Sequence, residues 1–99
     1  MVDKIPSPNI PQAIENLDGW TLSDNREAIT KSFKFPDFKT AFAFMSTIAT
    51  FAEEINHHPE WLNIYNKVDV TLTTHDIGGL SDLDIKMAQR MNEEMNLQP

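Results

Sequence analysis

The stretch that decides the fold is DFKTAFAFMSTIATFAEEINHHP, residues 37–59. Asp37 has the side chain of a helix N-cap. Pro59 ends any helix that reaches His58, because the residue before a proline is kept out of helical conformations. Between these limits, apolar side chains recur at the spacing of one helix face. This apolar stripe consists of Phe38, Ala41, Phe42, Met45, Ile48, Ala49, Ala52 and Ile55.

Phe44 and Phe51 widen the apolar stripe at one edge. Two interpretations explain a stripe of this width equally well: packing on the chain's own sheet alone, or an additional interface with another subunit. The chain has 99 residues and no cysteine. A domain of this size has a modest core, and a small domain without disulfides often gains stability by self-association.

Two short strands follow the long helix. Leu62 and Ile64 lie on one face of the first, and Val68, Val70 and Leu72 lie on one face of the second. A two-residue turn at residues 66–67 would place the first pair on the face opposite the second set. A three-residue loop over residues 65–67 would bring all five to one face. We expect the longer loop, because one buried face is the simpler solution for an antiparallel sheet.

The remaining elements flank this central part. A short helix is expected from Pro11 to about Leu17, and strands over about residues 20–23 and 28–35, joined by a turn at residues 24–26. Lys31 interrupts the apolar face of the second strand. Ser81 and Asp84 have the spacing of a capping box for a last helix.

The order α-β-β-α-β-β-α predicts a single α+β domain over residues 1–99, with a lead-in and short helix over 1–18 and a core over 19–96. Its four-stranded antiparallel sheet has the helices packed on one face.

Charge and hydropathy exclude several classes of function. The formal net charge is −7, and the eight Lys and Arg residues are scattered. Such a surface repels phosphate backbones, so we expect no nucleic-acid binding. No segment approaches the roughly 20 apolar residues of a membrane span, and the N-terminus lacks the apolar core of a signal peptide. We therefore expect a cytoplasmic protein that is not attached to a membrane.

The three histidines are the candidates for chemistry. His57 and His58 end the long helix, and His75 ends the last strand, so each lies where an element meets a loop. Glu53 precedes His57 by four residues. In a continuous helix the two side chains share a face, and the carboxylate would accept the imidazole N–H and favour the protonated ring. The alternative interpretation is a solvated surface pair of small energetic value.

Other kinds of site have less support. Three imidazoles with Glu53 or Asp76 would suit zinc by ligand type, but adjacent helix residues point about 100° apart, and the H-x-x-x-H spacing of helical metal motifs is absent. We therefore expect no metal.

Without a cysteine, a G-x-S-x-G elbow or a glycine-rich phosphate loop, acid–base chemistry by imidazoles remains. Trp61 and Tyr65 are placed either to flank a flat heterocycle or simply to pack.

These residues, taken together, resemble the pterin-4a-carbinolamine dehydratase family. The resemblance covers about residues 19–95 and rests on an acidic residue, three intervening positions and then His-His-Pro, followed by an aromatic residue, Tyr-Asn-x-Val, Thr-His and a later Asp. In this chain the matching residues are Glu53, His57-His58-Pro59, Trp61, Tyr65-Asn66, Val68, Thr74-His75 and Asp84. Thr73 and Asp76 stand where animal members often have Ser and Glu.

The resemblance implies an activity. Members of the family dehydrate the 4a-hydroxytetrahydropterin released by aromatic amino acid hydroxylases, and a reductase returns the quinonoid dihydropterin to the tetrahydro form. The reaction uses neither cofactor nor metal, and members form dimers or tetramers. In this chain His57 and His75 are expected to be the acid–base pair, with Glu53 orienting and charging His57. His58 is expected to line the pocket and to hold the substrate or share in proton transfer.

The substrate-binding residues that the resemblance implies are Thr73, Thr74 and Trp61. Thr74 is expected to hydrogen-bond the pterin through its backbone or side chain. Asp84 belongs to the family pattern, and its place in a capping box is sufficient to explain it as a structural residue.

Overall fold

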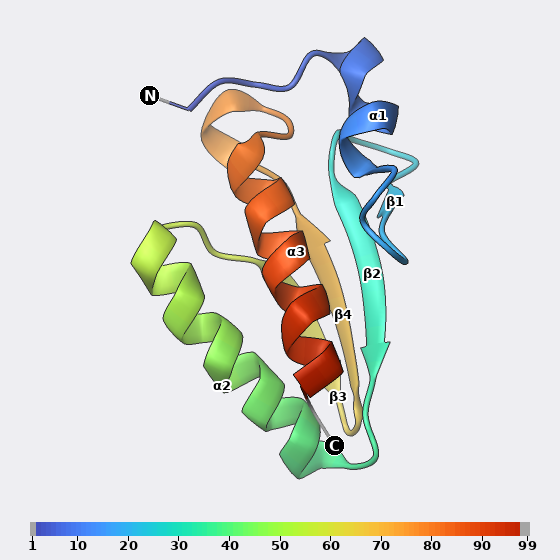
Figure 1. Ribbon diagram of the computed structural model, residues 1–99, viewed down its shortest axis with the longest axis vertical. Helices are drawn as coiled ribbons and strands as arrows, with labels where there is room; N and C mark the ends of the chain where they lie inside the picture. Colours follow the sequence, from blue (N-terminus) through green and yellow to red (C-terminus); the bar gives the residue numbers. More distant parts are fainter. Residues whose placement is uncertain (1, 98–99) are drawn as a thin grey trace.

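The computed structural model describes residues 2–97 of the chain. The strands are β1 (Thr21–Leu22), β2 (Ile29–Lys34), β3 (Glu60–Ile64) and β4 (Lys67–Leu72), and the α-helices are α1 (Ile10–Ile14), α2 (Phe38–Ile55) and α3 (Asp82–Leu97). The sheet order is β1-β2-β4-β3 with all neighbours antiparallel. The helices α2 and α3 lie side by side on one face of the sheet (Figure 1). The predicted α+β architecture and element order are confirmed within residues 2–97.

Helix α2 begins where the sequence predicts and ends earlier. The Asp37 carboxylate accepts a hydrogen bond of 2.8 Å from the Thr40 N–H, as an N-cap does. The helix stops at Ile55 because Asn56 takes the left-handed conformation, with φ of 52°. The His57 N–H then donates to the Ala52 carbonyl, which makes a Schellman-type ending. The two histidines therefore lie beyond the helix, and Pro59 is not what ends it.

The capping box at the start of α3 is confirmed. The Ser81 hydroxyl accepts from the Leu83 N–H at 3.2 Å, and the Asp84 carboxylate accepts from the Ser81 N–H at 3.0 Å. One N–H group of the helix's first turn and that of the residue before the helix are thus satisfied by neighbouring side chains. This local arrangement fixes where α3 starts and so where Asp84 points.

The core lies between the sheet and the two long helices. Phe44 of α2 is fully buried and stacks against Phe33 and Phe35, with ring centroids 5.0 and 5.1 Å apart. Lys31 enters this face from β2, as the sequence indicated. Its ammonium lies 4.8 Å from the centroid of the Phe33 ring and donates hydrogen bonds of 2.8 Å to the Asp18 carbonyl and to Asn92 Oδ1. The Lys31 ammonium, which interrupts the apolar face of the strand, thus has hydrogen-bond partners at the edge of the core.

The expected three-residue loop between β3 and β4 is wrong. The two strands pair Ile64 with Lys67, so the turn consists of Tyr65 and Asn66 alone. Tyr65 takes φ of 51°, and the Asn63 amide donates to the Tyr65 and Lys67 carbonyls at 3.1 and 3.0 Å. These side-chain hydrogen bonds stabilise a turn one residue shorter than the hydrophobic pattern suggested.

The shorter turn changes which face Leu62 and Ile64 occupy. Their side chains lie on the open face of the sheet, 56% and 60% exposed, whereas Val68 and Val70 point into the core. A one-residue change of register moves every side chain of a strand to the other face. β3 therefore presents apolar side chains at the edge of the sheet. None of the helices in the described part of the chain is long and apolar enough to cross a membrane.

Candidate active site

Three segments meet at one end of the sheet: the residues after α2, the end of β4 and the first turn of α3. His57, from the first segment, is 8% exposed. Its Nε2 lies 2.6 Å from Oδ1 of Asp84 in α3. Residues 27 positions apart in the chain thus form a buried pair of a ring and a carboxylate.

Asp84 is the centre of this arrangement. It is fully buried, and its second oxygen, Oδ2, accepts from the Thr74 hydroxyl at 2.7 Å and from the Ser81 N–H at 3.0 Å. The Thr74 and Ser81 hydroxyls lie 2.6 Å apart. Since the Thr74 hydrogen goes to Asp84, the Ser81 hydroxyl donates to Thr74, which gives a chain of donors that ends on the carboxylate.

This network assigns the hydrogen on the His57 ring. With Asp84 taken as the ionised carboxylate, Oδ1 has no hydrogen to give, so Nε2 of His57 carries one. Nδ1 is then the ring nitrogen available to a substrate. It accepts a proton when the ring is neutral and donates one when the ring is charged.

The predicted pair of Glu53 with His57 is wrong, because the structure pairs Glu53 with His58. Nε2 of His58 lies 2.5 Å from Oε2 of Glu53, and both side chains are exposed. The prediction assumed that α2 continues to His57, but the left-handed Asn56 turns the chain. His57 then points inward to Asp84, and His58 lies back over the end of the helix.

His75 lies in the 3-10 turn His75–Ile77 that follows β4, and its side chain is exposed. Glu60, the first residue of β3, is near it. The pKa of Glu60 is held below its ordinary value mainly by hydrogen bonding from Arg26, and the charge of His75 acts in the same direction with a smaller effect. The third histidine is therefore presented on the surface, next to Thr74, with a carboxylate and a guanidinium close by.

The expected substrate-binding residues have different surroundings. The Thr74 hydroxyl is committed to Asp84 and Ser81, and its N–H donates to the Gly79 carbonyl at 2.8 Å. The Thr73 hydroxyl lies 2.9 Å from the Glu27 carbonyl and 3.3 Å from that of Gly79. Trp61 is partly buried against the core. Their roles in binding a substrate remain predictions.

Sequence reasoning missed the second role of Asp84. Its spacing from Ser81 explained it as a cap, and nothing in the local sequence connects it to His57. Arg26 and Glu60 were also missed as neighbours of His75. Their ion pair joins the β1–β2 loop to β3, two segments far apart in the sequence. Among residues 2–97, no three His, Asp or Glu side chains form a group suited to a metal ion.

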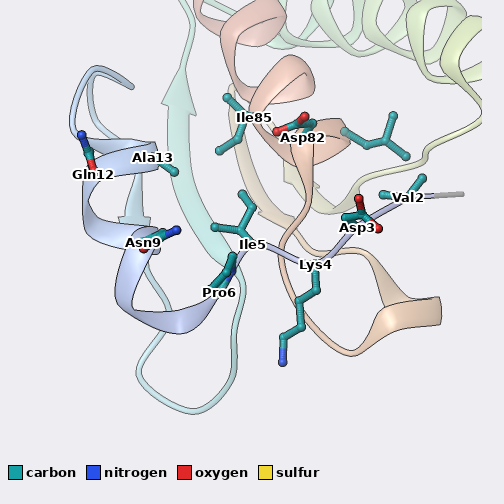
Figure 2. Close-up of a pocket in the computed structure, with 11 residues that line it drawn as sticks. Val2, Asp3, Lys4, Ile5, Pro6, Asn9, Gln12, Ala13, Asp82 and Ile85 are labelled. Atoms are coloured by element: carbon teal, nitrogen blue, oxygen red, sulfur yellow. The ribbon is translucent and has the colours of Figure 1, made fainter.

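A cavity of about 780 Å³ lies apart from the histidines, between the N-terminal segment, α1 and the start of α3 (Figure 2). Ile5, Leu83 and Ile85 are among its apolar lining residues, with Asp3 and Asp82 beside them. It includes none of the histidines and neither Glu53 nor Asp84, so the candidate active site is defined by its hydrogen-bond network and not by this cavity.

Comparisons with known proteins identify the family of this chain. Residues 3–94 match the model of the family described as pterin 4 alpha carbinolamine dehydratase. A Brucella ovis protein named "Putative pterin-4-alpha-carbinolamine dehydratase" is 54% identical over 90 residues, which cover 91% of this chain and 93% of that protein. A Brucella melitensis biotype 1 protein of the same name matches to the same extent.

Two solved structures share the fold. A crystal structure described as "transcriptional coactivator/pterin dehydratase" from Brucella melitensis is 53% identical, with a TM-score of 0.91 over 94% of this chain and 99% of that one. A pterin dehydratase-like protein described as a RuBisCO assembly factor in the alpha-carboxysome is 22% identical, with a TM-score of 0.66 over 78% and 89% of the two chains. The second likeness concerns the fold alone. The family model and the close relatives show that this chain belongs to the pterin-4a-carbinolamine dehydratase family.

Proposed function

We propose that this protein dehydrates 4a-hydroxytetrahydropterin to quinonoid dihydropterin by general acid–base catalysis with its histidines. The observation that carries the proposal is that one buried carboxylate, Asp84, joins the two histidine-bearing segments. It holds His57 through Oδ1 and Thr74, the neighbour of His75, through Oδ2. Burying a charged group is energetically unfavourable unless each of its hydrogen-bond donors is in place, so Asp84 favours the arrangement that brings these segments together.

The reaction needs an acid and a base. The C4a–O bond breaks as an acid protonates the leaving hydroxyl, which departs as water. A base takes the proton from N5, and the C4a–N5 double bond forms. Imidazoles serve in both roles near neutral pH, and a well-placed acid or base contributes about a hundred- to ten-thousand-fold in rate.

The histidines differ in what surrounds them, which suggests a division of labour. His57 is buried and fixed by Asp84, so its Nδ1 is presented in one orientation. His75 is exposed on the loop after β4 and is the partner we assign to it. His58, held by Glu53, lines the same end of the sheet and assists in proton transfer. Thr73, Thr74 and Trp61 are proposed to contact the pterin.

The substrate's chemistry places the protein in a sequence of reactions. A 4a-hydroxytetrahydropterin arises when a tetrahydropterin-dependent hydroxylase, such as an aromatic amino acid hydroxylase, completes its turnover. The quinonoid product needs two electrons to return to the tetrahydro form. The proposed role is therefore in tetrahydropterin recycling, between a hydroxylase and a reductase, and the dehydration itself needs neither cofactor nor metal.

Self-association is the second part of the proposal. Phe38 and Phe42 of α2 are 47% and 54% exposed, and their rings contact each other with centroids 5.8 Å apart. Leu62 and Ile64 are exposed on the edge strand β3. Large apolar side chains gathered on a helix face and on an open edge are typical of interfaces. Two such surfaces are consistent with a homodimer or a homotetramer.

The activity is tested by adding the purified protein to freshly generated 4a-hydroxytetrahydropterin and following ultraviolet absorbance. We expect fast turnover by the wild type and a loss of about a hundredfold or more in His57→Ala and His75→Ala. Gln89→Ala, an exposed change on α3, is the matched control and should retain wild-type rates. If the wild type does not exceed the rate in buffer, the enzyme proposal is wrong, and a role as a binding partner would replace it.

The association is tested by sedimentation equilibrium of Phe42→Glu beside Thr50→Glu, which places the same charge at another exposed position of α2. We expect only Phe42→Glu to lower the association state. A monomeric wild type at micromolar concentration would contradict this part of the proposal.

A further inference from the structure

The N-terminal strap, which we define as residues 3–9, crosses the loop that follows β4. The Ile5 N–H donates to the Leu80 carbonyl at 2.7 Å. Two side chains of the strap converge on Glu27: the Lys4 ammonium lies 3.4 Å from Oε1, and the Ser7 hydroxyl donates to Oε2. Figure 2 shows Lys4 pointing away from Asp82 and out of the cavity that the strap helps to line. The strap is thus held by Glu27 and by the end of the loop.

Glu27 also holds the loop itself, through its backbone. Its carbonyl accepts the hydrogen bond of 2.9 Å from the Thr73 hydroxyl. Thr73 immediately precedes Thr74 and His75, the residues proposed to act on the pterin. One residue therefore contacts the strap with its carboxylate and the start of the loop with its carbonyl oxygen.

Gly79 is the point where strap, Glu27 and loop meet. A Cβ atom at this buried glycine would lie 2.6 Å from Cε of Lys4 and 2.7 Å from Oε1 of Glu27, both closer than side chains tolerate. Gly79 also closes the loop, because its carbonyl accepts from the Thr74 N–H. The strap and the carboxylate therefore pack directly on the residue that pairs with Thr74.

The electrostatic state of Glu27 fits this role. Oε1 is buried and receives no hydrogen bond, so Lys4 is the charge that compensates it. The hydrogen bond from Ser7, with the charge of Lys4 in addition, lowers the pKa of Glu27, so that the group is ionised at neutral pH. The loop beyond Thr74 lies open to solvent, because His75, Asp76 and Gly78 are exposed.

We propose that Glu27 is a positioning residue: by clamping the N-terminal strap onto Gly79 and accepting from Thr73, it fixes the loop that presents Thr74 and His75. This inference rests on the proposed dehydratase function for its catalytic consequence. The restraint of the loop is a property of the structure that is measured without turnover. Glu27 touches no reacting atom and acts through the backbone of the loop.

The test compares Glu27→Ala, Glu27→Gln and Lys4→Met with the wild type. Glu15→Ala, an exposed acidic residue just after α1, is the matched control. The first readout is hydrogen–deuterium exchange at the Thr74 and Gly79 amides. In Glu27→Ala we expect exchange about tenfold faster or more, as for the loss of a charge-assisted hydrogen bond, with no change in the amides of α2. Glu27→Gln retains an acceptor for Ser7, so its effect should be smaller.

The second readout is kcat/KM for dehydration, measured well below the melting temperature of each variant. We expect a fall of about five- to fiftyfold in Glu27→Ala, partial rescue in Glu27→Gln and no change in Glu15→Ala. Loop amides that exchange as in the wild type would overturn the inference, as would a lowered Tm with kcat/KM unchanged. If the wild type itself shows no dehydration, the proposed function fails, and the exchange result alone decides whether Glu27 restrains the loop.

Discussion

Asp84→Asn changes one atom of the buried carboxylate that joins His57 to Thr74 and Ser81. An amide has one acceptor oxygen where the carboxylate has two. The Oδ2 side receives two donors, the Thr74 hydroxyl and the Ser81 N–H. We expect the amide oxygen to take that side, which leaves the NH₂ group facing Nε2 of His57, 2.6 Å from Oδ1 in the wild type.

The consequence for His57 follows from its ring. Facing an N–H donor, Nε2 becomes an acceptor and the hydrogen moves to Nδ1, the nitrogen proposed to face the substrate. A neutral ring that already carries hydrogen there cannot take the N5 proton. The expected loss in kcat/KM is the contribution of one acid–base group, about a hundred- to ten-thousand-fold, or roughly 3–5 kcal/mol in the barrier. The free energy of unfolding should fall by about 1–3 kcal/mol, because charge-assisted hydrogen bonds become neutral ones.

Two measurements check this prediction. The absorbance assay gives kcat/KM, and ¹⁵N NMR of the labelled ring reports which nitrogen of His57 carries the hydrogen. Asp82→Asn is the control, because Asp82 lies in the same first turn of α3 but is exposed. The reasoning is refuted if folded Asp84→Asn retains kcat/KM within threefold of the wild type, or if the His57 ring keeps its wild-type tautomer.

Three further predictions concern stability. Phe44→Ala should cost about 3–5 kcal/mol of unfolding free energy, measured by urea denaturation, because Phe44 is fully buried between two aromatic rings. Asn56→Ala should be less stable than Asn56→Gly by about 1 kcal/mol in the same assay, since φ is 52° at this position. Burial lowers the pKa of Lys31 from its ordinary value of 10.5. The folded state then binds fewer protons than the unfolded state just below pH 10.5, so the stability contributed by Lys31 rises as the pH approaches about 10.5. In that window the unfolding free energy of Lys31→Met should rise less steeply with pH than that of the wild type.

The starts of the two long helices were predictable because capping residues close in the sequence mark them. Asp37 caps α2 through a contact three residues away, and Ser81 with Asp84 starts α3 in the same way. Such signals depend on neighbours in the chain and are present before any tertiary contact forms. Apolar periodicity was less exact: Phe38 and Phe42 belong to the predicted apolar stripe of α2 but are exposed, whereas Phe44, predicted at its edge, is fully buried.

The β3–β4 turn was not predictable in this way. The hydrophobic pattern favoured one buried face, whereas the side-chain amides of Asn63 and Asn66 hold a two-residue turn. The Asn66 amide donates to the Phe35 carbonyl at 2.8 Å, 31 positions earlier in the chain. A contact at that separation outweighs the preference to bury Leu62 and Ile64, and the pattern of one strand cannot reveal it.

The partner of His57 was missed for a related reason. Counting four residues back from His57 gives Glu53, and that rule holds only while the helix continues. The left-handed Asn56 ends the helix before it reaches His57. His57 then pairs with Asp84 of α3, and His58 pairs with Glu53 of α2. Asn commonly occupies this conformation at helix ends, so the signal was present in the sequence but was weaker than the periodicity.

Asp84 shows why the site and the fold cannot be separated in this protein. As a cap, its carboxylate needs only a place near the Ser81 N–H, which an exposed position would provide. It is instead fully buried, where an ionised group is costly unless both of its oxygens receive hydrogen bonds. His57 and Thr74 donate them, so the energy of burying the charge is recovered only when both histidine-bearing segments are in place. A chain in which either segment moves away leaves a buried charge without its donors. Folding therefore selects the same geometry that the proposed acid–base chemistry requires.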